Sequence, residues 1–133
     1  MIVLDTHTLL WMDRNDTSLG AQTRHLIENA WQTSAIAVSA ISFWEVAMLA
    51  RRGRIVLPNA VELWRADIMQ AGVQEIPVTG NIALLATTFD DFHKDPADRF
   101  IVATAMHHGA LLLTADTKIL MWRADLLSHN AKV

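Results

Sequence analysis

Four acidic residues of this sequence stand where their neighbours do not readily explain them: Asp5, Glu45, Asp98 and Asp116. Asp5 follows the short apolar run IVL, and Asp116 comes soon after the apolar run LLLT. Side chains at the carboxyl ends of neighbouring parallel strands meet at one edge of a sheet. Taken alone, each of these two aspartates has a simpler explanation, which is that it caps the helix after it.

Glu45 and Asp98 belong to helical patterns with apolar surroundings. At helical spacing, Glu45 shares its side with Ile41, Met48 and Leu49, where an ionised carboxylate is costly unless it is paired or bound to a metal. The alternatives are an ion pair with Arg52 or another cation, or a side chain that extends to the surface.

Asp98 falls in the first turn of a helix whose expected cap is Asp95, with Pro96 at the first helical position. Its own alternative is a favourable contact with the positive end of the helix dipole.

The four carboxylates together predict a metal-assisted hydrolysis. Like charges in one cleft repel, so a cation must compensate them. The sequence has no cysteine, and none of its six histidines stands at ligand spacing beside these acids. An all-oxygen ligand set selects a hard cation such as Mg²⁺ or Mn²⁺. Such a cation can position a water for in-line attack on a phosphodiester, which points to a nucleic acid backbone as substrate.

Length and composition limit the classes of protein to consider. The 133 residues fit one domain, spanning 1–133, and the apolar fraction of 52% argues against disorder. The start MIVLDTHTLLWMD has no basic region before its apolar run, and no later run predicts a membrane span, so we expect a cytoplasmic protein without membrane contact. The net charge of −3 does not exclude a polyanionic partner, because four of the negative charges would be neutralised by bound cations.

The elements that must position these acids alternate between strand and helix. Short apolar runs predict strands at 2–4, 35–38, 73–78 and 110–113, and helical spacing predicts helices over 6–12, 21–31, 39–53, 60–70, 81–89 and 97–108. Residues 126–127 are either a last edge strand or a tail. This alternation indicates an α/β fold with a central parallel sheet covered by helices on both faces.

In this order, these segments resemble those of the PIN-domain nucleases, and among them the toxins of VapBC-type toxin–antitoxin pairs. The resemblance rests on IVLDTHTLLW, SAISFWEVAMLARRGRI, HKDPADRFIVATA and LLLTAD, and it spans nearly the whole chain. It implies a three-layer α/β/α PIN-like domain with a parallel sheet of four to five strands. The ending after residue 122 looks short for the family's final strand.

The resemblance also implies an activity and partners. The family's acidic positions fall on Asp5, Glu45, Asp98 and Asp116, as metal ligands and catalytic residues in Mg²⁺- or Mn²⁺-dependent cleavage of RNA. Thr114 would orient Asp116 or a metal-bound water. Toxins of this group commonly form homodimers and are silenced by a small antitoxin protein.

Several basic and aromatic residues are further candidates. RNA phosphates could be held by basic residues that flank the acids, namely Arg51, Arg52, Arg54, Lys94 and Arg99, although solvated surface charge explains any one of them. His7 lies close to Asp5 in sequence. Among the tryptophans, Trp44 is expected in the core, and those that could form a dimer or antitoxin surface are Trp11, Trp31 and Trp64.

Three functional hypotheses follow. The first is an endoribonuclease toxin held in check by an antitoxin, and the second is a non-catalytic PIN-fold domain that binds RNA or protein. The third, a phosphoryl-transfer enzyme with an aspartate nucleophile, ranks low because its usual motif needs an acid at position 7, where this sequence has His7. The full set of acids favours the first.

Overall fold

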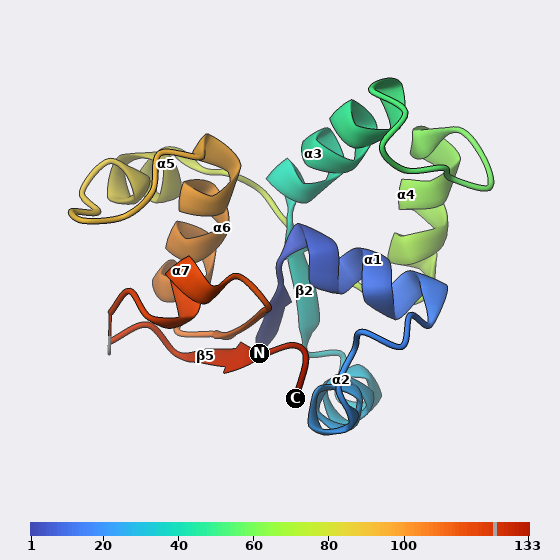
Figure 1. Cartoon of the computed structure of the whole chain (residues 1–133), viewed down its shortest axis with the longest axis horizontal. Coiled ribbons are helices and arrows are strands. Elements are labelled where there is room, and N and C mark those ends of the chain that lie inside the picture. The colour runs from blue at the N-terminus through green and yellow to red at the C-terminus, as the bar shows by residue number, and fades with distance from the viewer. Residues whose placement is uncertain (124) are drawn as a thin grey trace.

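The computed structural model describes residues 1–123 and 125–133 and contains one five-stranded sheet with helices on both of its faces (Figure 1). The elements follow the order β1 (Ile2–Leu4), α1 (Thr6–Arg14), α2 (Ala21–Gln32), β2 (Ile36–Ser39), α3 (Ala40–Arg51), α4 (Val61–Gln70), β3 (Gln74–Ile76), α5 (Gly80–Ala86), α6 (Pro96–His107), β4 (Leu111–Thr114), α7 (Thr117–Leu120) and β5 (Ser128–Asn130).

All strand pairs of the sheet are parallel, in the order β3-β2-β1-β4-β5. Leu4, at the end of β1, pairs with Val38 of β2 on one side and with Leu113 of β4 on the other. The carboxyl ends of these three strands therefore lie side by side. Strands β2 and β3 are added on one side of β1, and β4 and β5 are then added on its other side. The point where the strand order reverses therefore lies between β1 and β4.

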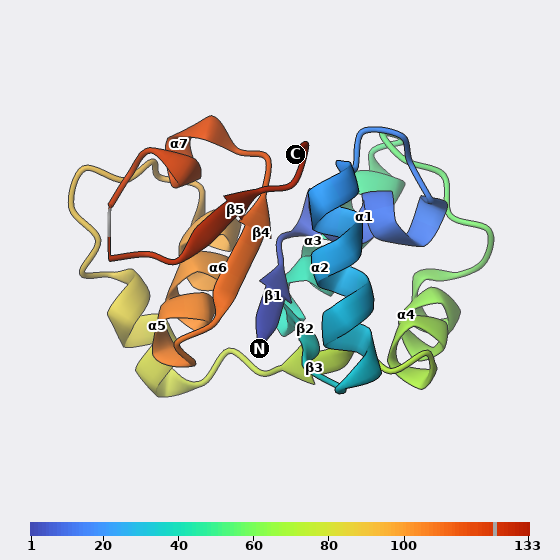
Figure 2. The ribbon, with the colours of Figure 1, turned by 90° about the horizontal axis from the view of Figure 1, so that it is seen from below.

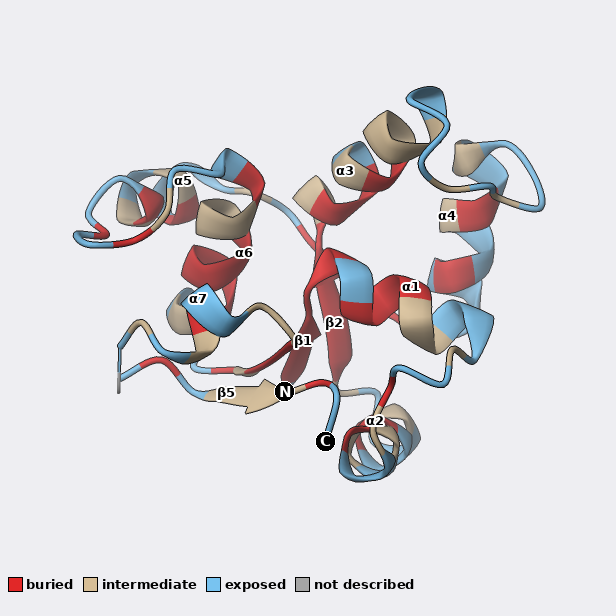
Figure 3. Cartoon of the chain, in the orientation of Figure 1, coloured by how far each residue is buried: buried red, intermediate tan, exposed pale blue. Residues whose placement is uncertain are grey.

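Alternate residues of the central strands face two separate cores. Ile2 and Leu4 belong to a core shared with helices α1 to α4, whereas Val3 faces a second core shared with α5, α6 and α7. Figures 1 and 2 show these two groups of helices on opposite sides of the sheet, and Figure 3 shows the central strands buried between them. This confirms the predicted three-layer α/β/α arrangement, with five strands.

Local signals in the sequence explain where the important helices begin. The Asp5 carboxylate accepts a hydrogen bond from the Thr8 amide (2.9 Å) and caps α1. Asp95 caps α6 through the Ala97 amide (3.0 Å), with Pro96 at the first helical position, as the sequence predicts.

The end of the chain differs from the expectation. The final strand is present as β5, Ser128–Asn130, slightly later than the candidate at 126–127, and it extends the sheet beside β4. Its three residues are only half-buried and carry no apolar side chain, so the apolar patterning of the sequence could not locate it.

Two tryptophan predictions are wrong. Trp64 is buried at 3% exposure, packs edge-on against Phe43 and donates to an Asp13 carboxylate oxygen at 2.9 Å, so it is no surface anchor. Trp44, predicted to lie in the core, is 50% exposed. Helix α3 is apolar almost all round, yet only Ser42, Phe43 and Val46 of its residues are buried. Trp11 and Trp31 are partly buried against the first core.

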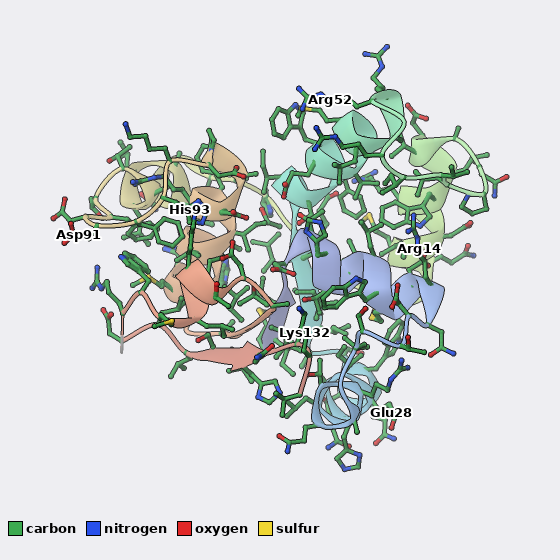
Figure 4. The ribbon with its side chains drawn as sticks, viewed as in Figure 1. Arg14, Glu28, Arg52, Asp91, His93 and Lys132 are labelled. Carbon is green, nitrogen blue, oxygen red and sulfur yellow. The ribbon has the colours of Figure 1, made fainter. Side chains whose placement is uncertain are left out.

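The last residues tie the sheet edge to α2. The Ala131 amide donates to the Thr114 carbonyl at 2.9 Å, and the Gly20 amide donates to the Ala131 carbonyl at 2.9 Å. A Cβ atom on Gly20 would lie 2.1 Å from the Val133 carbonyl oxygen, so only glycine fits at this crossing. The crossing places Lys132 between the two groups of helices (Figure 4).

Across the described residues, the helices are all too short or too polar to cross a bilayer.

We predict that Gly20→Ala destabilises the protein by about 1–3 kcal/mol, because the added methyl group meets backbone that cannot move aside freely. Urea unfolding measures the change. Gly80→Ala is the matched control, since a Cβ there meets nothing within 4 Å and alanine favours the start of α5. Equal stabilities of the two variants would show that the crossing is not rigid.

Candidate active site

A pocket of about 360 Å³ opens at the carboxyl edge of the sheet, beside the point where the strand order reverses. It is lined by Asp5, Thr6, His7, Trp11, Glu45, Asp95, Asp98, Ala115, Asp116 and Lys132. The four carboxylates selected from the sequence therefore share one pocket, with Asp95 as a fifth acid. They come from four separate places in the fold: the ends of β1 and β4, the second turn of α3 and the first turn of α6.

Asp5 lies deepest, at 6% exposure, and both of its carboxylate oxygens have partners. One oxygen accepts a hydrogen bond from the Thr8 amide and so caps α1. The other accepts a hydrogen bond from the hydroxyl of the fully buried Thr114. The Asp5 side chain therefore both caps α1 and lines the pocket.

Thr114 connects two of the acids across the point of strand reversal. Its hydroxyl donates to Asp5 and also accepts a hydrogen bond from the Asp116 amide at 3.1 Å. The expected role in orienting Asp116 therefore has a structural basis in the backbone of Asp116, while the hydroxyl proton itself goes to Asp5.

Glu45 has a partner that differs from the alternative considered for it. Its Oε1 atom accepts the Thr6 hydroxyl at 2.5 Å, and the buried Ser42 hydroxyl contacts Thr6 at 3.0 Å. Since a hydroxyl has one proton, Thr6 donates to Glu45 and the Ser42 hydroxyl donates to Thr6. Within the described part of the chain, no ion pair joins Glu45 to Arg52.

Asp98 and Asp116 face each other across His93. The His93 Nε2 atom lies 3.3 Å from Asp98 Oδ2 and 3.7 Å from Asp116 Oδ2. The second Asp116 oxygen, Oδ1, accepts the Lys118 amide at 2.8 Å and caps the short helix α7.

Burial and mutual repulsion set the protonation of the site. Burial is the main cause that raises the pKa of Asp5 and of Glu45 above their usual ranges. The pKa of Asp98 rises to about 8, first because of burial and then because of the negative charges of its neighbours, Asp95, Glu45, Asp116 and Asp5. Without a cation at neutral pH, Asp98 therefore keeps its proton in the folded protein and would release it when a cation binds.

The predicted basic residues are not gathered at the site. The Arg99 guanidinium donates to four carbonyls, those of Ala86, Phe89, Phe92 and His93, so it holds the loop before α6 and is not free to hold a phosphate. Arg51, Arg52 and Arg54 are exposed at the far end of α3, and Figure 4 shows Arg52 pointing outward from that end.

Three residues at the acidic cluster do not follow from the sequence: Thr6 and Lys132, which line the pocket, and His93, which lies beside Asp98 and Asp116. Thr6 and Lys132 carry no signal, because a hydroxyl after a capping aspartate and a lysine near a chain end are ordinary residues. His93 stands five residues before Asp98 in a polar loop, where neither helical nor strand spacing predicts that it lies beside the acids. The expectation that no histidine stands at ligand spacing beside the acids is wrong, because a ligand atom of His93 lies within 4.8 Å of those of Asp98 and Asp116.

The comparison with protein families decides the relationship. A model of the PIN domain matches residues 2–121. The chain belongs to the PIN-domain family. This PIN domain is also 34% identical over 119 residues to Ribonuclease VapC22 of Mycobacterium tuberculosis, and the match covers 89% of this chain and 88% of that protein.

Solved structures of low identity share the same fold. VapBC2 from Rickettsia felis, bound to a DNA fragment from its promoter, matches with a TM-score of 0.73 and 16% identity, over 98% of both chains. A toxin–antitoxin complex from Klebsiella pneumoniae matches with a TM-score of 0.65 and 19% identity, also over 98% of both chains. Both likenesses concern the fold of this PIN domain.

The acidic cluster fits a metal ion. Ligand atoms of His93, Asp98 and Asp116 all lie within 4.8 Å of one another, as atoms around one ion do. In the described part of the chain, no arginine or lysine forms an ion pair with Asp5, Glu45, Asp98 or Asp116, so their charges are left for another cation. The amino ends of α1 and α6 at the pocket offset only part of this charge.

The raised pKa of Asp98 predicts an unusual dependence of stability on pH. In EDTA, the folded protein binds a proton at Asp98 that the unfolded chain has lost, so this contribution to stability is full below pH 3.8 and is lost as the pH rises through about 8. Asp98→Asn should therefore raise the melting temperature in EDTA, more at pH 8.5 than at pH 5.

Thermal unfolding of both proteins at several pH values measures this effect. Asp67→Asn, on the exposed side of α4, is the control and should show no such trend. A melting-temperature difference that stays constant with pH would contradict the assignment of the raised pKa to Asp98.

Proposed function

We propose that this PIN domain is a ribonuclease that hydrolyses RNA phosphodiesters with Mg²⁺ or Mn²⁺, and that it is the toxin of a type II toxin–antitoxin system. The observation that carries the proposal is the pocket in which Asp5, Glu45, Asp98 and Asp116 meet with no arginine or lysine paired to them among the described residues. The 34% identity to a protein named Ribonuclease VapC22 supports the choice of RNA as substrate.

Asp5, Glu45, Asp98 and Asp116 are the residues that would hold the cation. When bound, a divalent cation polarises the phosphodiester and makes a water more acidic near neutral pH. The hydroxyls of Thr114 and Thr6 keep the Asp5 and Glu45 carboxylates in fixed orientations, so these two acids need not reorganise when the substrate arrives. Asp98 and Asp116 are half-buried, with 20% and 32% of their side chains exposed, so the scissile phosphate would reach them from solvent.

The RNA backbone would contact basic groups at two distances from the acids. Lys132 lines the pocket itself and is suited to the scissile phosphate or its neighbour. Arg51 and Arg52 lie about two turns beyond Glu45 at the end of α3, Arg54 follows just after the helix, and all three would contact nucleotides further along the RNA strand. Arg99 is withdrawn from this set because of its four carbonyl partners.

An antitoxin is the proposed protein partner. Structural neighbours of this PIN domain include toxin–antitoxin complexes. The chain exposes an apolar surface that suits a partner: Trp44 on α3 is half-exposed, and an apolar hollow lies between the end of α3 and the start of α4, lined among others by Ala50, Ile55 and Leu57. A homodimer, which the family resemblance implies, is part of the same proposal and is tested by the mass of the purified protein in solution.

The activity predicts metal-dependent cleavage of RNA. With Mg²⁺ or Mn²⁺ the purified protein should cut RNA, and EDTA should abolish the cleavage. Asp5→Asn and Asp98→Asn should each lower the rate by about a hundredfold or more, because each keeps the shape of the side chain and removes a charge that the cation needs. Gel electrophoresis of labelled RNA measures the rate.

Asp67→Asn, on the exposed face of α4, is the matched control and should cleave at the original rate. Thermal unfolding verifies that each variant is folded. Binding of RNA by the unaltered protein without cleavage in either metal would favour the non-catalytic alternative, in which the chain keeps only the fold and a binding surface.

The position of Lys132 predicts a specific effect on RNA binding. Lys132→Ala should weaken binding of single-stranded RNA and lower the slope of its salt dependence by about 0.7, as expected for one lost phosphate contact. Fluorescence anisotropy in the presence of Ca²⁺, in place of the catalytic metal, measures both quantities. Arg14→Ala is the matched control: it also removes one positive charge, but at the end of α1 that is far from the pocket, so it should leave the slope unchanged. An equal effect of the two variants would argue against Lys132 as a phosphate ligand.

A further inference from the structure

His93 lies on the loop between α5 and α6 (Figure 4), beside two of the acids that line the pocket, Asp98 and Asp116. Its side chain is 18% exposed, and its Nε2 atom is buried and has no hydrogen-bond partner. Nε2 is nevertheless close to two carboxylate oxygens, those of Asp98 and Asp116. The nitrogen is thus near both acids and aligned for hydrogen bonding to neither.

This geometry fits three ligand atoms that bind one cation between them. A buried imidazolium paired with one carboxylate would direct its N–H straight at that oxygen. Ligand atoms at right angles around an octahedral cation, each about 2.1 Å from it, lie about 3 Å apart. The separations of 3.3 and 3.7 Å from Nε2 to the two oxygens are close to that spacing.

The imidazole ring is also held in place, as a ligand must be. It stacks on the Phe92 ring with centroids 4.5 Å apart, and the Arg99 guanidinium lies 5.7 Å from the centroid of Phe92. Arg99 also restrains the loop, because it donates hydrogen bonds to the backbone carbonyls of both Phe92 and His93. The ring therefore needs little reordering to bind a cation.

We propose that His93 is a nitrogen ligand of the cation and forms, with Asp98 and Asp116, a mixed nitrogen and oxygen face of the site that favours Mn²⁺ over Mg²⁺. Imidazole nitrogen is a good ligand for first-row transition metals, whereas Mg²⁺ prefers oxygen ligands. The other ring nitrogen, Nδ1, is not among the buried atoms without a partner, so it is able to carry the proton of the neutral ring. This inference rests on the proposed divalent-cation site and specifies which metal it prefers.

The test is whether a nitrogen of His93 is bonded to Mn²⁺. The full chain is freed of metal with EDTA, exchanged into buffer and loaded with one equivalent of Mn²⁺. Electron spin-echo envelope modulation then detects coupling between Mn²⁺ and nitrogen-14. We expect coupling in the unaltered protein and its loss in His93→Gln.

His7→Gln is the matched control, because His7 lines the acidic pocket but lies outside the group formed by His93, Asp98 and Asp116. It should retain the coupling. Absence of coupling in the unaltered protein, its persistence in His93→Gln, or its loss in His7→Gln would each overturn the proposal. Circular dichroism verifies folding, and His93→Ala serves as the second variant if glutamine disturbs the loop.

Calorimetry supplies a second measurement without reference to RNA. His93→Gln should weaken Mn²⁺ binding by about tenfold to a hundredfold and change Mg²⁺ binding much less. An equal loss for both metals would overturn the preference for Mn²⁺. Intact nitrogen coupling in a protein that cuts no RNA would count against the proposed ribonuclease and leave the His93 ligand standing.

Discussion

The structure depends on the electrostatic cost of holding five carboxylates around one pocket. Like charges at this distance repel, and the sheet and helices impose the distance whether or not a cation is present. The protein offsets part of this cost with hydroxyls and helix ends instead of arginines. Thr114 donates to Asp5, Thr6 donates to Glu45, and backbone amides of three helix starts bind Asp5, Asp95 and Asp116. Neutral donors leave net negative charge in the pocket, which an arginine would have cancelled.

The topology of the sheet explains why these particular residues meet. Parallel strands β1 and β4 are neighbours although more than a hundred residues separate them, and their register brings the end of one beside the end of the other. Asp5 and Thr114 can hydrogen-bond only because of that register. Asp98 reaches the site by a different route: it stands on the first turn of α6, whose buried face packs into the second core. The site thus depends on the pairing of β1 with β4 and on helices from both layers, α3 and α6.

The sequence predicts features that arise from local patterns, and it misses those that arise from tertiary contacts. Short apolar runs and capping residues located four of the five strands and the starts of α1 and α6, because burial and helix capping act on neighbouring residues. β5 was displaced by two residues, since its half-buried polar side chains have no apolar pattern. Trp44 and Trp64 were assigned to the wrong environments because apolar character alone does not tell which side of a helix meets another layer.

The same distinction holds within the site. The sequence points to the four acids because each is a charged residue next to apolar neighbours that do not explain it, and the structure places all four in one pocket. Their partners were not found, since Thr6, Lys132 and His93 contradict nothing around them. Arg99 shows the opposite error: a basic residue beside an acidic motif suggested a phosphate ligand, yet its guanidinium holds the loop that carries His93.

Assembly of the site from distant elements links metal binding to the stability of the whole domain. The unfolded chain has the same carboxylates, but they are far apart and share no ion, so a cation binds the folded state almost alone. Its binding free energy therefore adds to the free energy of unfolding, in proportion to the logarithm of its concentration over the dissociation constant. The repulsion that weakens the metal-free fold is the same repulsion that a bound cation would relieve. An arginine in the pocket would raise the free energy of unfolding of the metal-free protein but would lower the affinity for a cation. Hydroxyls and amides orient the acids without cancelling their charge.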